Sequence, residues 1–426
     1  MAFYNACDYF IWLSEICGAG SSLPKKVYEA FGGDMKSAYE ADFSEYIAMG
    51  IDKQQAEVLL DKDFTRANSI IDYCAENRVG VLPFGSEYYP KRLYDIENPP
   101  PVLYYKGRIE KLSDSAAITA IGSRKCTDAA YESGYSFSYK LAGAGVNIVT
   151  GIAEGIDTAS TLGALDAGGF SVGVLGSGIN ILYPFENHSL FTRMFKSGLI
   201  ITEFSPYTEP KGVNFPIRNR IMAALCDGVL VVEARQGSGA LITAKYAKDM
   251  GKLIFVMPGN INDPKSRGSN ELIRDGAIPV IEVSDILSHL EYSYPDTVSV
   301  RRSRRLRLEE RDKYISRRKR RKEQLLEKMR KSKEEYAVSK SGEDKTKALA
   351  EKENLEKEQP FSADLSNLSP CEKAIYEFIA KGKTTADIIG RELKIDQSEV
   401  LYTLTMLEID GLIISLPGGA YEAVTK

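Results

Sequence analysis

The sequence contains only two histidines, His188 and His289, and its six cysteines are scattered without a CxxC pair. Zinc sites need Cys and His ligands at short spacings, so no metal site is expected. Unpaired cysteines are typical of reduced thiols in a reducing compartment. No apolar run approaches the ~20 residues of a membrane span, and Asp8 and Glu15 interrupt the early apolar stretch that could have been a signal peptide. These features predict a cytoplasmic protein without a membrane segment.

The chain also lacks the common nucleotide and catalytic motifs. Neither a Walker GxxxxGK[ST] sequence nor a GxGxxG with a ribose-binding acid is present. Ser177 and His188 show no recognisable triad arrangement. The carboxylates Glu203 and Asp227 occupy positions at element ends that favour structural roles. The sequence therefore predicts no catalytic residue and no cofactor.

Composition divides the chain into four regions. Residues 1–76 form short helices separated by glycines, and the stretch YIAMGIDKQQAEVLL resembles a helix-hairpin-helix of SAM-like type. Residues 80–291 alternate β-branched runs with Ala-rich helical stretches, and residues 292–364 form a charged basic linker, disordered or helical. Residues 365–426 predict three helices and a hairpin, which is the pattern of a winged helix.

The region 80–291 predicts the α/β class. Its apolar runs each end in small residues: AAITAIGS, GVNIVTG, FSVGVLGSG, GLIITEF, DGVLVVEA, KLIFVMPG and AIPVIE. Strands that are apolar on both faces suit a sheet covered by helices on both sides. Their alternation with helices predicts a Rossmann-like, doubly wound, mostly parallel sheet.

The loops that follow these strands are candidate anion sites. Open α/β sheets place ligands at the carboxyl ends of their strands, where Gly-rich turns expose backbone N–H groups. The candidate phosphate-binding residues are Gly122, Ser123, Arg124, Gly151, Gly155, Gly176, Gly178, Gly237, Ser238 and Gly239. The segment FPIRNR adds Phe215, Arg218, Asn219 and Arg220, and Lys211 lies just upstream. Cations, backbone donors and an aromatic ring together suit single-stranded nucleic acid.

Two other interpretations remain open on these residues. In the first, the GSGALITA loop holds the phosphate of a nucleotide or phosphosugar and Glu233 acts on a glycosidic bond, as in an enzyme. In the second, the winged helix binds duplex DNA as a transcription regulator. The helix DQSEVLYTLTMLEIDG, which would be its recognition helix, is nearly devoid of Lys and Arg, and this argues against duplex binding.

The order of the motifs resembles the DNA-processing protein A (DprA/Smf) family. GSR, GIAEGID, GSGINILYPFEN, FPIRNR, GSGALITA, MPGN and SRGSNELIRDGA follow one another over about residues 80–290. The resemblance implies a protein that binds and protects incoming single-stranded DNA and helps load the recombinase RecA in natural transformation. It also implies a homodimer and DNA contacts by Arg124, Phe215, Arg218 and Arg220, with Lys211, just upstream, as a further candidate.

The chain departs from the family pattern in its charges. Glu154 and Phe185 stand where the family commonly has basic residues. Residues 301–333 contain 17 Lys and Arg against 5 Asp and Glu, a net charge of +12, so the rest of the chain carries −16. This basic segment is either a solvated tether or an electrostatic arm for the DNA backbone, whose contribution would fall steeply with salt.

Overall fold

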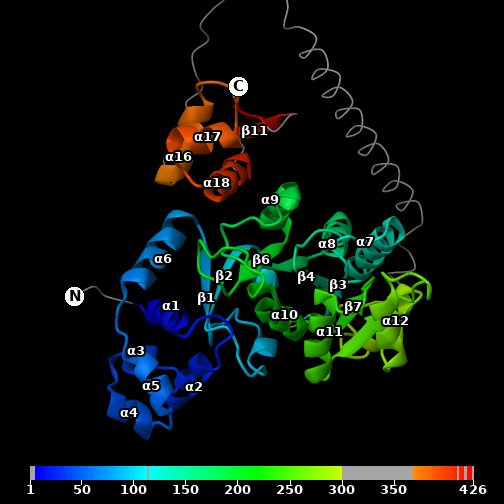
Figure 1. The fold of residues 1–426 in the computed structure, drawn as a ribbon, viewed down its shortest axis with the longest axis horizontal. Helices are drawn as coiled ribbons and strands as arrows, with labels where there is room; N and C mark the ends of the chain where they lie inside the picture. The colour runs from blue at the N-terminus through cyan, green and yellow to red at the C-terminus, as the bar shows by residue number, and fades with distance from the viewer. Residues whose placement is uncertain (1–4, 113–114, 300–367, 410–411, 417–419, 425–426) are drawn as a thin grey trace, which may run out of the picture. The chain divides into compact units, whose positions relative to one another are not determined.

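The computed structural model describes residues 5–112, 115–299, 368–409, 412–416 and 420–424 (Figure 1). The basic segment 301–333, and the linker from residue 300 on, lie outside the described residues. Among the described residues, no helix has the length and apolar character needed to span a membrane.

The chain begins with six short helices. They are α1 (Ala6–Cys17), α2 (Leu23–Ala30), α3 (Met35–Glu40), α4 (Phe43–Ala48), α5 (Lys53–Leu59) and α6 (Thr65–Glu76). Acidic or amide side chains start several of them, for example the capping boxes at Asn5 and Asp42, because such side chains satisfy otherwise unpaired N–H groups. Gly50, with φ of 82°, makes the turn between α4 and α5, where the sequence predicts a helical hairpin.

The central sheet has nine strands among the described residues. They are β1 (Gly80–Pro83), β2 (Val102–Gly107), β3 (Ala117–Ile121), β4 (Asn147–Thr150), β5 (Ser171–Val174), β6 (Leu199–Thr202), β7 (Gly228–Val231), β8 (Leu253–Val256) and β9 (Ile278–Pro279). Their order is β1-β2-β6-β5-β4-β3-β7-β8-β9. The strands from β3 to β9 pair in parallel, whereas β1 pairs with β2, and β2 with β6, in antiparallel register.

The doubly wound, mostly parallel sheet is confirmed. The sequence analysis did not include β1 and β2, because these strands are joined without an α-helix and so lack the strand–helix alternation. Helices cover both faces (Figure 1): α7 (Asp128–Gly143) and α8 (Ile156–Asp166) lie on one side, and α10 (Asn214–Ala224) and α11 (Gly239–Asp249) on the other.

Alternate residues of single strands belong to two different cores. On β7, Leu230 packs with Leu141 of α7, whereas Val229 and Val231 pack in the core that includes Ile221 of α10. Side chains of a strand point to opposite faces with a period of two, so a strand covered on both sides must be apolar throughout. The remaining helices of this region are α9 (His188–Ser197), α12 (Arg267–Arg274) and α13 (Val283–Leu290).

The C-terminal region is a winged helix, as predicted. It contains α16 (Pro370–Ile379), α17 (Ala386–Leu393) and α18 (Gln397–Ile409), then the hairpin of β11 (Ile413–Leu416) and β12 (Ala420–Ala423). Ser369 and Glu372 form a capping box around Pro370, the first residue of α16. A two-residue strand not predicted from the sequence, β10 (Thr384–Thr385), pairs with β12.

Candidate functional site

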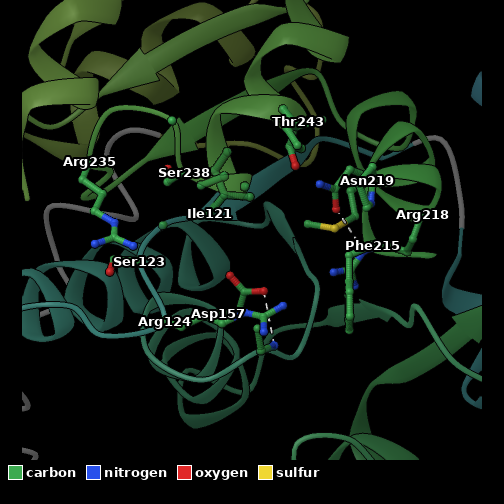
Figure 2. A pocket seen from close by; sticks show the side chains of 18 of the residues that line it. Ile121, Ser123, Arg124, Asp157, Phe215, Arg218, Asn219, Arg235, Ser238 and Thr243 are labelled. Carbon is green, nitrogen blue, oxygen red and sulfur yellow. Dashed lines mark hydrogen bonds between the residues drawn. The ribbon is translucent and has the colours of Figure 1, made fainter. Parts of the chain in front are cut away.

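A pocket lies at the point in the sheet where the strand order reverses. In the sheet, β4, β5 and β6 follow one another on one side of β3, and β7, β8 and β9 follow one another on its other side. In such sheets the crevice at the reversal point is the usual ligand site. A pocket of about 960 Å³ opens there between the loops that follow β3 and β7 (Figure 2). Loops after β4 and β8 and one face of α10 complete it.

The loop after β3 is held between two neighbouring elements. Ser123 N donates to the carbonyl of Glu233 at 2.8 Å, and Ile156 N donates to the carbonyl of Ser123 at 3.3 Å. This anchoring leaves the following side chain, Arg124, exposed at the pocket. The Arg124 guanidinium carbon lies 5.0 Å from the centre of the Phe215 ring, so a cation and an aromatic face stand side by side.

One face of α10 lines the opposite wall. Phe215, Arg218, Asn219 and Met222 line the pocket, and positions three, four and seven residues apart share one face of a helix. Phe215 is half-buried and presents its ring beside Arg124. The motif FPIRNR therefore contributes an aromatic ring to the pocket.

Arg218 lies at the pocket floor, and its guanidinium is already bound. It is 5% exposed, and it donates to the carbonyls of Gly151 (3.1 Å) and Val174 and to the side-chain oxygen of Asn219 (3.1 Å). Burial lowers the pKa of Arg218 to about 10. Nearby Asp157 also lines the pocket, and burial raises its pKa to about 6 against the opposing effect of Arg218.

Arg220 does not line the pocket. Both its terminal nitrogens donate to the carboxylate of Glu203 at 2.6 Å, and the two side chains are 3% and 1% exposed. Glu203 also accepts from the backbone N–H of Gly20 at 3.1 Å. A guanidinium enclosed in this way cannot reach a phosphate, so the DNA contact expected of Arg220 is withdrawn and its role is structural.

Four of the glycines expected to hold phosphate serve packing instead: Gly151, Gly155, Gly176 and Gly178. None lines the pocket. A Cβ at Gly155 would stand 2.3 Å from the carbonyl oxygen of Ser123, and one at Gly176 would stand 2.9 Å from the Phe215 ring. These glycines let neighbouring backbone and side chains approach closely, and so they shape the pocket without forming its surface.

The loop after β7 differs from these. Gly237, Ser238 and Gly239 line the pocket, and a Cβ at Gly237 or Gly239 would meet nothing within 4 Å. The hydroxyl oxygen of Ser238 is buried and has no hydrogen-bond partner among the described residues. This loop therefore opens the start of α11 to the cavity.

Cations that the sequence analysis did not single out also line the pocket. With Arg124 they form a set that we call the rim cations: Arg124, Lys125, Arg235 and Lys265. Arg124, Lys125 and Arg235 are exposed and Lys265 is half-buried, and none has an ion pair with another described residue. Each lies in a loop soon after a parallel strand, and this position is the signal that could have identified it.

Lys211 lies outside the pocket, although the next residue, Gly212, lines it. The Lys211 ammonium is 3.5 Å from the carboxylate of Glu209, and both side chains are largely exposed. DNA contact by Lys211 stays a prediction, and it would have to occur outside the pocket.

The carboxylates considered for catalysis hold the fold together. Glu233 is 4% exposed and accepts from the hydroxyl of Thr127 at 2.7 Å and from its backbone N–H at 3.2 Å. Asp227 pairs with Arg92 at 3.0 Å. Neither carboxylate lines the pocket, so the enzyme interpretation loses the residue on which it depended.

Known proteins match this chain over both its α/β region and its winged helix. The family model for DNA recombination-mediator protein A matches residues 80–291, and that for the DprA winged helix domain matches 359–419. Protein Smf of Synechocystis is 32% identical over 290 residues, which cover 66% of this chain and 72% of that protein. DNA processing protein DprA of Streptococcus pneumoniae is 38% identical over 204 residues, which cover 48% and 72%.

A solved structure agrees with these matches. The X-ray structure of DprA from Streptococcus pneumoniae superposes with a TM-score of 0.59 at 29% identity, covering 68% of this chain and 99% of that one. The likeness thus extends over nearly the whole of the solved DprA chain and about two thirds of this one. On these matches in sequence and fold, the chain belongs to the DprA/Smf family of DNA-processing proteins.

Proposed function

We propose that the pocket between β3 and β7 binds single-stranded DNA, and that the protein protects incoming DNA during transformation and recombination. The observation that carries this proposal is a pocket lined by the four rim cations, which have no ion pair among the described residues, and by the half-buried ring of Phe215, which lies 5.0 Å from the Arg124 guanidinium carbon. Cations hold the phosphates of a strand and an aromatic face stacks its bases. Duplex bases are already stacked within the helix and cannot use that ring.

The proposal includes a non-enzymatic role without a cofactor. The pocket-lining carboxylate is Asp157, whose oxygen accepts from the backbone N–H groups of Gly151 (3.0 Å) and Ala153 (3.3 Å). Glu233, the candidate for glycosidic chemistry, is bound to Thr127. The pocket thus offers groups that hold a phosphate, and its carboxylate is engaged in shaping a loop.

RecA loading and homodimer formation are further parts of the proposal, and they rest on family membership. The matched family is that of DNA recombination-mediator protein A. A recombination mediator is a protein that delivers a recombinase to DNA. A gel shift of single-stranded oligonucleotide with and without RecA tests the first part, and the mass in solution tests the second. A ternary complex and a mass of two chains are expected.

Binding to labelled oligo-dT tests the DNA site. Arg124→Ala should weaken affinity by roughly ten- to a hundredfold, because a charge-assisted contact is worth about 1.5–3 kcal/mol. Duplex of the same length should compete less well than single strand, and free nucleotides should compete poorly. Equal affinity of the variant and wild type, or efficient competition by a free nucleotide, would contradict the proposal.

A further inference from the structure

We propose that the pocket holds a second phosphate of the same strand at the α11 corner, defined as Arg235, Ser238, Gly239 and Lys265. This inference rests on the proposed function, and it makes the pocket a site for two phosphates with Arg124 holding the first. The second would be bound by two cations and by the first turn of α11.

The two cations of the corner come from different loops. Arg235 follows β7 and Lys265 follows β8, yet both line the pocket. Neither has an ion pair among the described residues, and Arg235 is exposed. Figure 2 shows Arg235 on the side of Ser123, across the pocket from Phe215. The Arg235 charge therefore lies apart from the Phe215 ring, which Arg124 covers.

The start of α11 supplies donors of a second kind. Ser238 is the N-cap of this 11-residue helix, but its hydroxyl makes no capping hydrogen bond and its buried oxygen has no partner among the described residues. A buried hydroxyl without a partner is costly, and a ligand oxygen would remove that cost. Gly239 leaves the first turn open, since no atom lies within 4 Å of a Cβ there. N–H groups at a helix start favour an anion.

Arg124 and Arg235 lie at different places in the pocket, because Arg124 is at the Phe215 ring and Arg235 is across the pocket from that ring (Figure 2). The Arg124 guanidinium lies over Phe215 at 5.0 Å, so a phosphate on Arg124 is beside the base that stacks on that ring. A volume of about 960 Å³ is at the upper end of the 300–1,000 Å³ typical of small-molecule sites. The cavity thus has room beyond one phosphate, and in a DNA strand the next anion is the neighbouring phosphate.

A double-mutant cycle on oligo-dT affinity tests whether Arg124 and Arg235 bind two different phosphates or the same one. The proteins are wild type, Arg124→Ala, Arg235→Ala and the double variant, each measured over a range of salt. Arg235→Ala should weaken binding about tenfold and lower the slope of log affinity against log salt by about 0.7, the value for one phosphate of a single strand. If two phosphates are bound, the fold-changes of the single variants should multiply in the double variant.

The matched control is Arg267→Ala. Arg267 is an exposed arginine of α12 that pairs with Glu271 at 3.5 Å and does not line the pocket, so its loss should leave affinity unchanged. Gly239→Ala adds an independent readout. The added methyl would enter open space where a phosphate is expected, so binding should weaken several-fold while the melting temperature does not fall, because Ala is the better helix former.

The outcomes distinguish the two proposals. A weaker Arg124→Ala with an unchanged Arg235→Ala overturns the second phosphate and leaves the DNA site intact. Single-variant losses that fail to multiply also overturn it, since both arginines would then hold one phosphate. If neither variant changes affinity for oligo-dT, the proposed function itself fails. Competition by dTMP equal to that of oligo-dT would assign the corner to a free nucleotide and overturn the strand assignment.

Discussion

Arg218 and Arg220 of α10 differ from the rim cations in what already surrounds them. The two α10 guanidinium groups are 5% and 3% exposed and are bound by backbone carbonyls, by Asn219 or by Glu203. Arg124 and Arg235 are exposed and have no ion pair in the described part of the chain. The α10 arginines therefore contribute to the stability of the pocket, whereas the rim arginines are available to a ligand.

This contrast shows that a basic motif near a pocket contains two kinds of charge. Breaking a buried ion pair by removing one partner costs much, because the other charge is left buried and unpaired. An exposed cation costs little to remove unless a ligand depends on it. Stability measurements and binding measurements should therefore sort the arginines into the same two groups as the structure does.

The largest effect is expected from Arg220→Met. Removing the guanidinium leaves the Glu203 carboxylate buried, with Gly20 N as its one remaining donor among the described residues, so the free energy of unfolding should fall by about 3–5 kcal/mol. Urea unfolding measures it. The double variant Arg220→Met with Glu203→Gln should recover much of the loss, because the unpaired charge is gone. A loss below about 1 kcal/mol would show that the Arg220–Glu203 pair stabilises the fold no more than an exposed ion pair does.

The Asp157 carboxyl at the pocket floor should give stability a pH dependence. Its pKa in the folded protein is raised by burial to about 6, so between about pH 4 and pH 6 the folded state retains a proton that the unfolded state has released. The free energy of unfolding should therefore fall as pH rises through this window, by up to about 3 kcal/mol at 1.36 kcal/mol per pKa unit.

Urea unfolding of wild type and Asp157→Asn from pH 4 to pH 7 isolates that contribution. Carboxyls whose pKa is lowered, such as Asp34 and Asp42, act in the opposite direction and cancel in the difference between the two proteins. The same pH profile in both proteins would show that Asp157 titrates normally.

Phe215→Ala tests the aromatic part of the pocket. Loss of stacking should weaken oligo-dT binding by about 1–3 kcal/mol per stacked base, with the salt slope retained because no charge is removed. Tyr207→Ala is the control: Tyr207 is also exposed, at 52%, but its ring packs on Tyr73 at 5.0 Å outside the pocket. Equal losses in both variants would remove Phe215 from the site.

The smallest effect is expected in the stability of Arg124→Ala. Because this arginine is exposed and without an ion pair, the free energy of unfolding should change by no more than about 0.5 kcal/mol, even though DNA affinity drops. Thermal or urea unfolding beside the binding assay tests this. A loss above about 1 kcal/mol would show that Arg124 stabilises the fold, as the α10 arginines do, and would contradict the distinction between the two groups.

The sequence was sufficient for the parallel strands of the sheet, but not for the antiparallel strands β1 and β2 or for the environment of single side chains. Strand–helix alternation predicts the parallel strands, and the loops after β3 and β7 do lie at one pocket. The burial of Arg220 depends on Glu203, which comes from the end of another strand, and no local pattern joins these two residues. Sequence likewise does not distinguish Gly176, packed against Phe215, from Gly239, which faces open space.

The missed rim cations have a related cause. Arg235 and Lys265 lie just outside the motifs GSGALITA and SRGSNELIRDGA, and the adjacency of β7 and β8 brings their loops to one rim. Charge in a loop becomes informative once the strand order is known. The parallel topology predicts that order only in part, since β7 could have been added at either edge.

The pairing of β3 with β7 also affects how the protein folds during its synthesis. Ile118 pairs with Gly228, and at about 5–20 residues per second of synthesis the ribosome needs roughly 5–20 s to supply the second strand after the first. During that interval one edge of β3, an entirely buried strand in the finished protein, has no neighbour. Contacts so distant along the chain slow folding, and an unpaired apolar edge invites aggregation. Chaperone dependence and low yield in fast expression are therefore expected to originate at the same strand that later borders the pocket.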